Sequence, residues 1–352
     1  MKLLAATTVL LASNYQNYCS AETTSDVTDS KGSSEIPQAD SASEKVYVVT
    51  GASSGFGKGV ALKLGQMKAK VVLAARRAAL LDDIAAQITI SGGTAIVVPT
   101  DVSVAESVEK LAEAAIGRFG RIDVWINNAG VGALGPFENI PLADHSKLID
   151  INLKGTIYGS HVAINQFKKQ KFGTLINVGS IDSEVPLAYQ ASYSASKAAV
   201  LSLGRAINEE MRLAGMKKVK VATIMPWAAD TPWWDHAANY SGGTARMAMM
   251  DDPQIVVDAI VKASSHPAEE IPVGWKAKSS NFFHHVMPDT AESFSASVSH
   301  KYQIETAPPA PHTDGTLFQP MPTGTAVEGG VRARMKEEKA RSREKKVGLV
   351  NR

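Results

Sequence analysis

A tyrosine and a lysine four residues apart, Tyr193 and Lys197, carry the most distinctive chemistry in this sequence. They lie in a run that continues with helical periodicity, so both side chains leave the same face of the helix. A lysine cation beside a phenol favours the phenolate and lowers the pKa of the tyrosine from its ordinary value near ~10. We therefore expect Tyr193 to donate and accept a proton near neutral pH. The alternative is a chance pairing on an ordinary helix.

The glycines Gly51, Gly55 and Gly57 stand between a strand-like run, 46–50, and a helical pattern that begins at about Val60. A helix start offers unpaired N–H groups and a positive dipole end, and glycines allow a pyrophosphate to approach it closely. The spacing, Gly-x-x-x-Gly-x-Gly, differs from the commoner Gly-x-Gly-x-x-Gly of dinucleotide sites. Its position between strand and helix nevertheless predicts a dinucleotide site.

Two arginines, Arg76 and Arg77, follow the next apolar run, 70–75, at the place where a dinucleotide fold meets the adenosine ribose. An acidic residue there accepts hydrogen bonds from the 2′-hydroxyl, whereas arginines pair with a 2′-phosphate. The sequence therefore favours NADP(H), with NAD(H) as the second possibility. The alternative is a pair of solvated charges at the start of the helix 78–90.

Polar residues follow the third and fourth strands as well. Asp101 precedes Val102 after the third strand and is placed to accept a hydrogen bond from the adenine amino group. Ser103 is expected to cap the next helix; the alternative is that Asp101 itself is the cap. Asn127 and Asn128 end the fourth strand, where two amides can tie neighbouring strands together. The small residues Ala129 and Gly130 after them leave room for a ring.

The elements that must position these residues alternate along the chain. Strands alternating with helices imply parallel βαβ units in a doubly wound α/β sheet, whose ligands bind at the carboxyl ends of the strands. A long helix from Pro141 to about Lys169 carries Asn152 in its interior, either for a local task or as a satisfied core amide. We expect strands at 46–50, 70–75, 94–99, 124–126, 174–178, 219–225 and 271–274, and further helices at 193–214 and 253–265.

Together these motifs resemble the short-chain dehydrogenase/reductase family over about residues 44–275. The resemblance implies a Rossmann-type parallel sheet of seven strands and hydride transfer between a nicotinamide and a carbonyl or alcohol carbon. The residues that carry it are Thr50-Gly51-Ala52-Ser53-Ser54-Gly55-Phe56-Gly57, Asn127-Asn128-Ala129-Gly130, Asn152, Ser180 and Tyr193-x-x-x-Lys197.

The resemblance also implies roles. Tyr193 is the general acid in reduction and the base in oxidation, and Lys197 lowers its pKa and binds the nicotinamide ribose. Ser180 hydrogen-bonds the substrate oxygen, and Asn152 holds a water that links Lys197 to solvent. The cofactor contacts expected are Gly51, Ser53, Ser54, Gly55, Phe56, Gly57, Arg76, Arg77, Asp101, Val102, Asn128, Ala129, Gly130, Tyr193, Lys197, Pro226 and Thr231.

The chain departs from the family after the sixth strand. Trp227 stands where glycine usually follows the proline, and Ala229 where a branched residue often packs on the nicotinamide. Both put the contacts of Pro226 and Thr231 in doubt. The stretch that follows is rich in tryptophan and methionine, and we expect a flexible apolar cover over the substrate or, alternatively, ordinary core packing. Its members are Trp233, Trp234, Met247, Met249 and Met250.

Composition sets broad limits. The 352 residues are 44% apolar, enough for a substantial core, and the formal net charge of +2 predicts no particular partner. The single cysteine, Cys19, excludes an intrachain disulfide and a cysteine-based metal site. The eight histidines show no ligand spacing beyond the adjacent His284 and His285, which we assign to the surface or to packing. No metal is expected.

The two ends of the chain lie outside the resemblance. Residues 1–21 have the pattern of a secretory signal, or of an unstructured extension, and residues 22–43 that of a disordered linker. The catalytic domain is expected at 44–278. The extension 279–352 is expected to be partly helical and rich in Pro and Gly. Its basic end, Arg332 to Lys346, is expected to be a solvated face or, alternatively, to bind an anionic membrane. Nucleic acid is not expected, since aromatics are not interleaved with the charges.

We thus expect an NADP(H)-dependent oxidoreductase for a small or medium apolar carbonyl or alcohol; the alternative is a dinucleotide-binding regulator or scaffold with vestigial chemistry. The helices 141–169 and 193–214 are expected to form a homodimer or homotetramer. Because NADP(H) must be supplied, a cytoplasmic or cytoplasm-facing, membrane-associated location is favoured. The signal-like start, which also offers a membrane contact, leaves an exported or lumenal location as the alternative.

Overall fold

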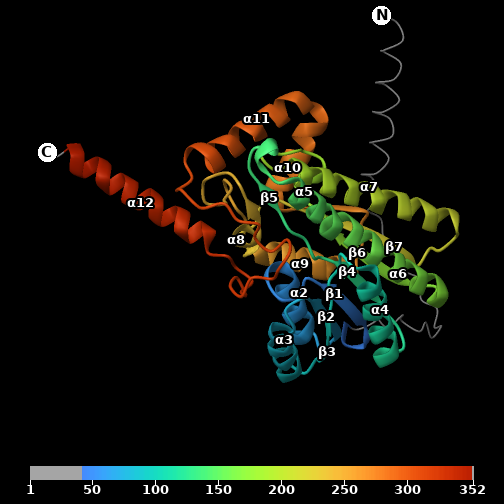
Figure 1. Ribbon diagram of the computed structural model, residues 1–352. Helices are drawn as coiled ribbons and strands as arrows, with labels where there is room; N and C mark the ends of the chain where they lie inside the picture. Colours follow the sequence, from blue (N-terminus) through green and yellow to red (C-terminus); the bar gives the residue numbers. More distant parts are fainter. Residues whose placement is uncertain (1–41, 351–352) are drawn as a thin grey trace, which may run out of the picture. The chain divides into compact units, whose positions relative to one another are not determined.

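Seven parallel strands form the central sheet of the computed structural model, which describes residues 42–350 (Figure 1). The strands, in the spatial order β3-β2-β1-β4-β6-β7-β9, are β1 (Val46–Thr50), β2 (Lys70–Ala75), β3 (Thr94–Pro99), β4 (Val124–Asn127), β6 (Gly173–Val178), β7 (Val219–Pro226) and β9 (Glu270–Val273). The order reverses direction between β1 and β4, which opens a crevice at the carboxyl ends of these strands. The expected doubly wound α/β sheet is confirmed.

The register of the sheet explains why its strands are continuous apolar runs. Val48 of β1 pairs with Val72 of β2 on one side and with Trp125 of β4 on the other. A parallel sheet is covered by helices on both faces, so side chains pointing either way need to be apolar. Every residue of β1 is accordingly buried.

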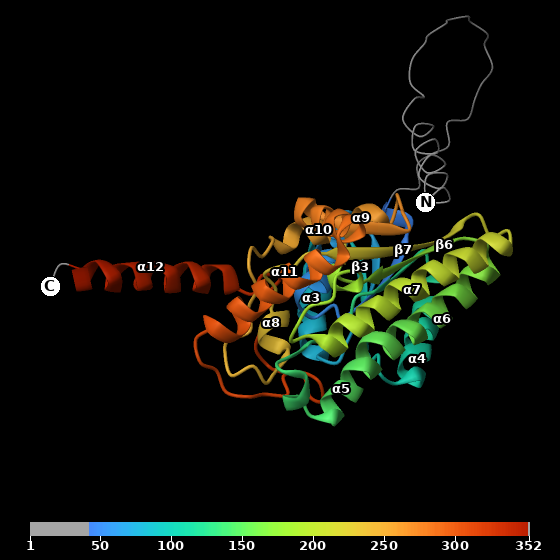
Figure 2. The same cartoon turned by 90° about the horizontal axis from the view of Figure 1, so that it is seen from above.

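Helices cover both faces of the sheet (Figure 2). On one face, the buried core joins strand side chains to α2 (Gly55–Gln66), α3 (Ala78–Ile90) and α9 (Pro253–Ala263). On the other face, the core includes residues of α4 (Ala105–Phe119), α6 (Gly155–Gln170) and α7 (Ala191–Leu213). The remaining elements are α5 (Leu142–Ile149), α8 (Trp233–His236), α10 (Gly274–Val286), α11 (Pro288–His300), α12 (Val331–Val350) and the two-stranded parallel pair β5 (Ala133–Leu134) and β8 (Ala238–Asn239).

The single helix expected from Pro141 to Lys169 is wrong, because a π-helical turn over Asp150–Lys154 divides it into α5 and α6. The wider turn carries Asn152, which is fully buried. Gly155 follows it, and a Cβ there would lie 2.9 Å from Val102, so the chain passes very close to the end of β3 at this point. Single π-turns of this kind occur frequently at functional sites.

The domain boundary expected at Lys278 is also wrong, since it falls inside α10, and the described part of the extension belongs to the same compact unit as the sheet. The leader expected at 1–21 and most of the linker expected at 22–43 lie outside the described residues. Among the described helices, none combines the length and apolarity needed to cross a membrane.

Candidate active site

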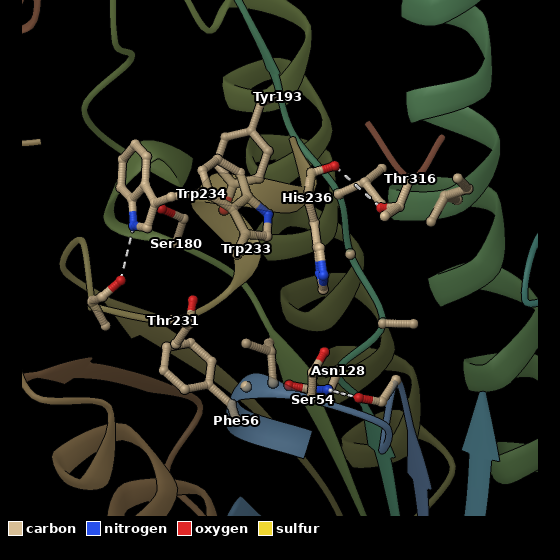
Figure 3. Close-up of a pocket in the computed structure, with 18 of the residues that line it drawn as sticks. Ser54, Phe56, Asn128, Ser180, Tyr193, Thr231, Trp233, Trp234, His236 and Thr316 are labelled. Carbon is tan, nitrogen blue, oxygen red and sulfur yellow. Dashed lines mark hydrogen bonds between the residues drawn. The ribbon is translucent and has the colours of Figure 1, made fainter. Parts of the chain in front are cut away.

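A cavity of about 240 Å³ lies at the carboxyl ends of the strands (Figure 3). It is lined by all the site residues expected from the sequence except Gly57 and Asn152. The side chains come from loops after β1, β2, β3, β4, β6 and β7 and from α7. The expectation that these motifs meet at one edge of the sheet is thus confirmed in the fold.

The glycine-rich turn between β1 and α2 uses its glycines in different ways. Gly51 and Gly55 have φ of 66° and 54°, a region that favours glycine. A Cβ on Gly57 would lie 2.3 Å from the Gly51 carbonyl oxygen, so Gly57 serves the packing of the turn itself. A Cβ on Gly55 would meet nothing closer than 3.7 Å, at Thr231, so the cavity is open beside it.

Two amide side chains hold the strand ends together, as expected from the sequence. Asn127 Nδ2 donates to Asn177 Oδ1 at 2.9 Å and so joins β4 to β6. Asn128 Nδ2 donates to the carbonyl oxygen of Thr50 at 2.9 Å and so joins β4 to β1. The Thr50 hydroxyl in turn accepts from the backbone N–H of Asn128 at 3.0 Å. These bonds keep the crevice between β1 and β4 rigid.

Ser180, which follows the end of β6, meets Tyr193 and Lys197 from the first turns of α7. Ser180 caps a short 3₁₀ turn, because its hydroxyl accepts from the N–H of Asp182 at 3.1 Å. Lys197 Nζ donates to the carbonyl oxygen of Val178 at 2.8 Å and lies 5.6 Å from the centre of the Tyr193 ring. The spacing of four residues on α7 therefore presents the phenol and the ammonium to one cavity wall, opposite Ser180.

A buried carboxylate, which the sequence analysis missed, completes this group. Asp182 is 5% exposed and lies two residues after Ser180, at a position with no distinguishing motif. Burial raises the pKa of Asp182 to about 7, against the effects of the Ser180 hydroxyl and the Lys197 ammonium. Burial likewise lowers the pKa of Lys197 to about 8, against the effect of Asp182. Both groups therefore exchange protons near neutral pH.

The pKa of Tyr193 is raised above its ordinary value in the chain without cofactor. The expectation that Lys197 makes this pKa lower than usual is therefore wrong for this state. Burial has the largest effect, and the negative charge of Asp182 adds to it; hydrogen bonding with Ser180 works in the opposite direction. Desolvation disfavours the charged phenolate. Tyr193 consequently keeps its proton at neutral pH and is suited to give it away.

Asn152 stands behind the catalytic wall. Its Oδ1 accepts from the N–H of Val131 at 2.8 Å, and its Nδ2 donates to the Val131 carbonyl oxygen at 2.9 Å and to Ser196 Oγ at 3.1 Å. A Cβ on Gly130 would lie 3.5 Å from both Asn152 Oδ1 and Lys197 Nζ, so the three groups are neighbours. These bonds match the alternative of a satisfied core amide; the expected water link to Lys197 stays a prediction.

Arg76 and Arg77 lie at the other end of the cavity, after β2. Arg77 donates from Nη2 to the hydroxyls of Ser53 and Ser54, each at 2.9 Å. Among the described residues, neither arginine forms an ion pair with a carboxylate. Two unpaired guanidinium groups beside two hydroxyls form a donor set that fits a phosphate group.

Asp101 lines the cavity as expected but does not cap the next helix, so the alternative expected for it is wrong. Its Oδ1 accepts from the N–H and the hydroxyl of Ser103, at 2.9 and 2.7 Å. The helix α4 begins at Ala105, after Val104, and no side chain caps it, so the expected Ser103 cap is wrong. Asp101 instead closes the turn before the helix while it lines the cavity.

The flexible apolar cover expected from the tryptophan and methionine stretch is wrong for most of its members. Trp234, Met247 and Met250 are at most 7% exposed, because Val331 and neighbouring residues of the C-terminal extension pack over them. Trp233 remains beside the site, with its ring centre 5.1 Å from that of Tyr193 (Figure 3). Trp233 therefore forms part of the substrate wall, and the buried Trp234 and Met247 also line the cavity, whereas Met250 is core and Met249 is 61% exposed.

Comparison with known proteins agrees with this geometry. A profile described as short chain dehydrogenase matches residues 45–240, more than half of the chain. The chain belongs to this family.

Relatives and solved structures give the same result for this short-chain dehydrogenase. The uncharacterized oxidoreductase YxnA of Bacillus subtilis is 31% identical over 278 residues, which are 78% of each chain. A short-chain dehydrogenase/reductase of Burkholderia phymatum in complex with NAD has a TM-score of 0.64 and 26% identity, over 70% of this chain and 94% of that one. An alcohol dehydrogenase of Thermococcus sibiricus complexed with 5-hydroxy-NADP has a TM-score of 0.56 and 26% identity, over 64% and 94%.

Family membership establishes the class of reaction. The protein is an oxidoreductase that acts on CH–OH or C=O groups with a nicotinamide dinucleotide as cofactor. The cavity fits such a ligand, since the arginine and serine donors stand at one end and Tyr193 and Lys197 at the other. The cavity is also lined by residues that no short-range pattern marks. Asp182 and Gln190 stand close to the motifs in the sequence, whereas others lie far from them: His236, Thr316, Pro320 and Met321.

Proposed function

We propose that this short-chain dehydrogenase is an NADP(H)-dependent enzyme that reduces a small or medium apolar carbonyl compound. The observation that carries the proposal is the convergence of Ser180, Tyr193 and Lys197 at one end of a cavity whose other end holds Arg76 and Arg77. The dinucleotide, when bound, supplies the hydride. The wall formed by Trp233 and its neighbours favours an apolar substrate.

The proton chemistry follows from the three catalytic side chains. The hydroxyl of Ser180 hydrogen-bonds the carbonyl oxygen and stabilises the charge that develops on it. Tyr193 donates its phenolic proton to that oxygen, for which the raised pKa is no obstacle, because an alkoxide is the stronger base. Lys197 stands 5.6 Å from the phenol ring and supplies positive charge that favours the phenolate after transfer.

The raised pKa of Tyr193 favours reduction over oxidation at neutral pH. Oxidation of an alcohol needs the phenolate. At pH values below the pKa of Tyr193, each rise of one pH unit increases the phenolate population about tenfold. We therefore expect the rate of alcohol oxidation to rise with pH. Carbonyl reduction is expected to fall above pH 8, since Lys197, whose pKa is about 8, loses its charge there.

A panel of aldehydes, ketones and alcohols, assayed with the purified full-length chain, tests this function. We expect oxidation of NADPH with apolar carbonyls, and a ratio of oxidation to reduction that grows between pH 7 and pH 9. Tight binding of dinucleotide without turnover anywhere on the panel would instead favour the second candidate, a dinucleotide-binding regulator or scaffold.

We propose NADP(H) as the preferred cofactor and NAD(H) as the weaker one. Arginine side chains at the end of β2 are matched in charge to a 2′-phosphate, which the adenosine ribose of NAD(H) lacks. The Burkholderia protein was found with NAD and the Thermococcus protein with an NADP derivative, so the family fold accommodates either.

We also propose a homodimer or homotetramer through α6 and α7. Ile157 of α6 is 40% exposed, and α7 presents a face of small residues that lets a second helix approach closely. Leu201 of α7 is 2% exposed and belongs to the core rather than to this face. We expect light scattering at micromolar concentration to give at least twice the 37.4 kDa mass of one chain; a monomeric mass would contradict the interface.

We propose that the enzyme is located on the cytoplasmic side, because it needs a supply of NADP(H). We propose that membrane contact is made through the leader or through the basic residues of α12. Sequencing the N-terminus after cell fractionation tests it. A mature chain that begins near Glu22 in an exported fraction would contradict it.

A further inference from the structure

The C-terminal segment 313–330, here named the strap, runs along the adenosine end of the cavity. It lies outside the part of the chain that matches the family profile. Arg76 Nη2 donates to the Thr316 carbonyl oxygen at 2.6 Å, and Nη1 lies 3.4 Å from the carbonyl oxygens of Leu317 and Phe318. Figure 3 shows Thr316 beside His236, whose backbone carbonyl oxygen accepts from the Thr316 hydroxyl at 3.2 Å.

The same segment occupies the second arginine. Arg77 Nη1 donates to the carbonyl oxygens of Met321 and Thr323, at 3.1 and 3.2 Å. The other donors of Arg77 bind Ser53 and Ser54, so its hydrogen-bonding capacity is filled.

The strap also reaches the start of α2. The N–H of Gly55 donates to the Ala326 carbonyl oxygen at 2.9 Å, and Lys58 Nζ donates to that of Thr325 at 3.0 Å. Strap carbonyls therefore accept from both arginines that the proposed function assigns to the 2′-phosphate, and also from the N–H of Gly55 in the glycine-rich turn. The strap is a ligand of the dinucleotide site supplied by the chain itself.

Carbonyl oxygens satisfy these donors without cancelling their charge. Burial lowers the pKa of both arginines, yet a guanidinium group stays protonated in proteins. A 2′-phosphate carries nearly two negative charges and forms stronger, charge-assisted hydrogen bonds than a neutral carbonyl does. NADP(H) can therefore replace the strap at Arg76 and Arg77. NAD(H) carries no 2′-phosphate to exchange for the strap at these two arginines.

We propose that the strap competes with the 2′-phosphate for Arg76 and Arg77 and thereby sets the preference between NADP(H) and NAD(H). The inference rests on the proposed function. While the strap is in place, its carbonyls offer acceptors to the ribose hydroxyls of NAD(H), and the apparent affinity for NADP(H) is reduced by the fraction of molecules in which the strap is bound.

Both ends of the strap are anchored, so its middle, which carries the Met321 and Thr323 carbonyls, can leave Arg77 while the segment stays attached. At the start, Thr313 exchanges two backbone hydrogen bonds with Asn239, and Leu317 is fully buried. At the end, the buried carboxylate of Asp230 accepts from the N–H groups of Val331 and Arg332, at 2.8 and 3.0 Å.

The middle is held by packing against His236, which suggests a variant. His236 Nε2 lies 3.0 Å from the Thr323 carbonyl oxygen, and a Cβ on Gly324 would come within 2.3 Å of that nitrogen. Gly324→Ala should therefore displace the middle of the strap without touching Arg76 or Arg77. Gly330→Ala is the matched control, because φ is 73° there against 67° at Gly324, but a Cβ would meet nothing within 4 Å.

The test measures equilibrium binding of NADPH and NADH to the full-length chain by nucleotide fluorescence. We expect Gly324→Ala to bind NADPH about tenfold more tightly than the native chain does, which corresponds to the loss of one or two competing hydrogen bonds. NADH affinity should change by less than about twofold. Gly330→Ala should behave as the native chain.

Hydrogen exchange measured by mass spectrometry supplies a readout on the strap itself. In the native chain, NADP⁺ should speed exchange of the backbone amides at 313–330, and NAD⁺ should not. The inference is overturned if Gly324→Ala frees the strap amides yet leaves NADPH affinity unchanged. Slower strap exchange with NADP⁺, together with weaker NADPH binding by the variant, would overturn it too, because the strap would then cover the bound cofactor.

A second variant is needed in case Gly324→Ala fails to fold or leaves the exchange of the strap amides unchanged. A Cβ on Gly315 would come within 2.2 Å of the His236 carbonyl oxygen, so Gly315→Ala should loosen the strap near its start. The same binding shifts are expected, and unchanged NADPH affinity in this variant counts against the inference. Failure of the proposed function looks different, since every variant would then either bind neither dinucleotide or bind dinucleotide without turnover on the carbonyl panel.

Discussion

Tyr193→Phe is expected to lower the rate of carbonyl reduction by about 10²–10⁴-fold, the range for loss of a general acid. The change removes the one hydroxyl that transfers a proton and keeps the ring. Because the ring packs beside Trp233, the fold and the binding of dinucleotide should be preserved. Single-turnover rates with NADPH and the best carbonyl of the panel, combined with dinucleotide titration, measure both effects.

Tyr158→Phe is the matched control for this prediction. It makes the same chemical change on α6, where the partly buried ring packs against the core on the face of the sheet that α4, α6 and α7 cover and does not line the cavity. Turnover of this variant should stay within about twofold of the native rate. Near-native turnover of Tyr193→Phe would show that another group transfers the proton, and the assignment would fall.

Arg76→Ala combined with Arg77→Ala is expected to weaken NADPH binding by about 100-fold or more. Hydrogen bonds to charged groups contribute about 1.5–3 kcal/mol each, and about 1.4 kcal/mol corresponds to a tenfold change. NADH has no 2′-phosphate, so its affinity should change by no more than about threefold. Fluorescence titration of both reduced cofactors gives the ratio directly.

Removing two positive charges also changes the field of the whole protein, so a control with equal charge is needed. Arg118→Ala with Arg341→Ala removes two exposed arginines outside the cavity. This variant should bind both cofactors normally. An equal loss of NADPH and NADH affinity in the Arg76, Arg77 variant would mean that these arginines do not bind the 2′-phosphate. Comparison with Gly324→Ala, which keeps the arginines, separates their own contribution from that of the strap.

The elements that position the site were readable from the sequence because their patterns are local. Each predicted strand of the sheet lies within one residue of an observed strand, since a parallel strand must be apolar on both faces. The glycine turn, the Asn127 and Asn128 amides and the Tyr193, Lys197 pair were predictable for the same reason. Each is set by neighbours in the chain and by the rule that ligands bind at strand ends.

Electrostatics at the site were not readable in this way. The sequence places Lys197 beside Tyr193, which predicts a lowered pKa of the phenol. The fold adds burial and the carboxylate of Asp182, and these raise it. Desolvation depends on how much protein surrounds a group, and that quantity is a property of the packed structure rather than of spacing along a helix.

The sequence by itself therefore determined the family, the sheet and the residues that meet at its edge, because periodicity and short motifs encode local geometry. Tertiary structure alone decided which groups Arg76 and Arg77 contact. The strap that holds them is rich in proline and glycine, without periodicity, and lies about 240 residues further along the chain. Backbone carbonyls are common to all residues, so no side-chain pattern records where they bind; only the folded path of the chain brings them to the cofactor site.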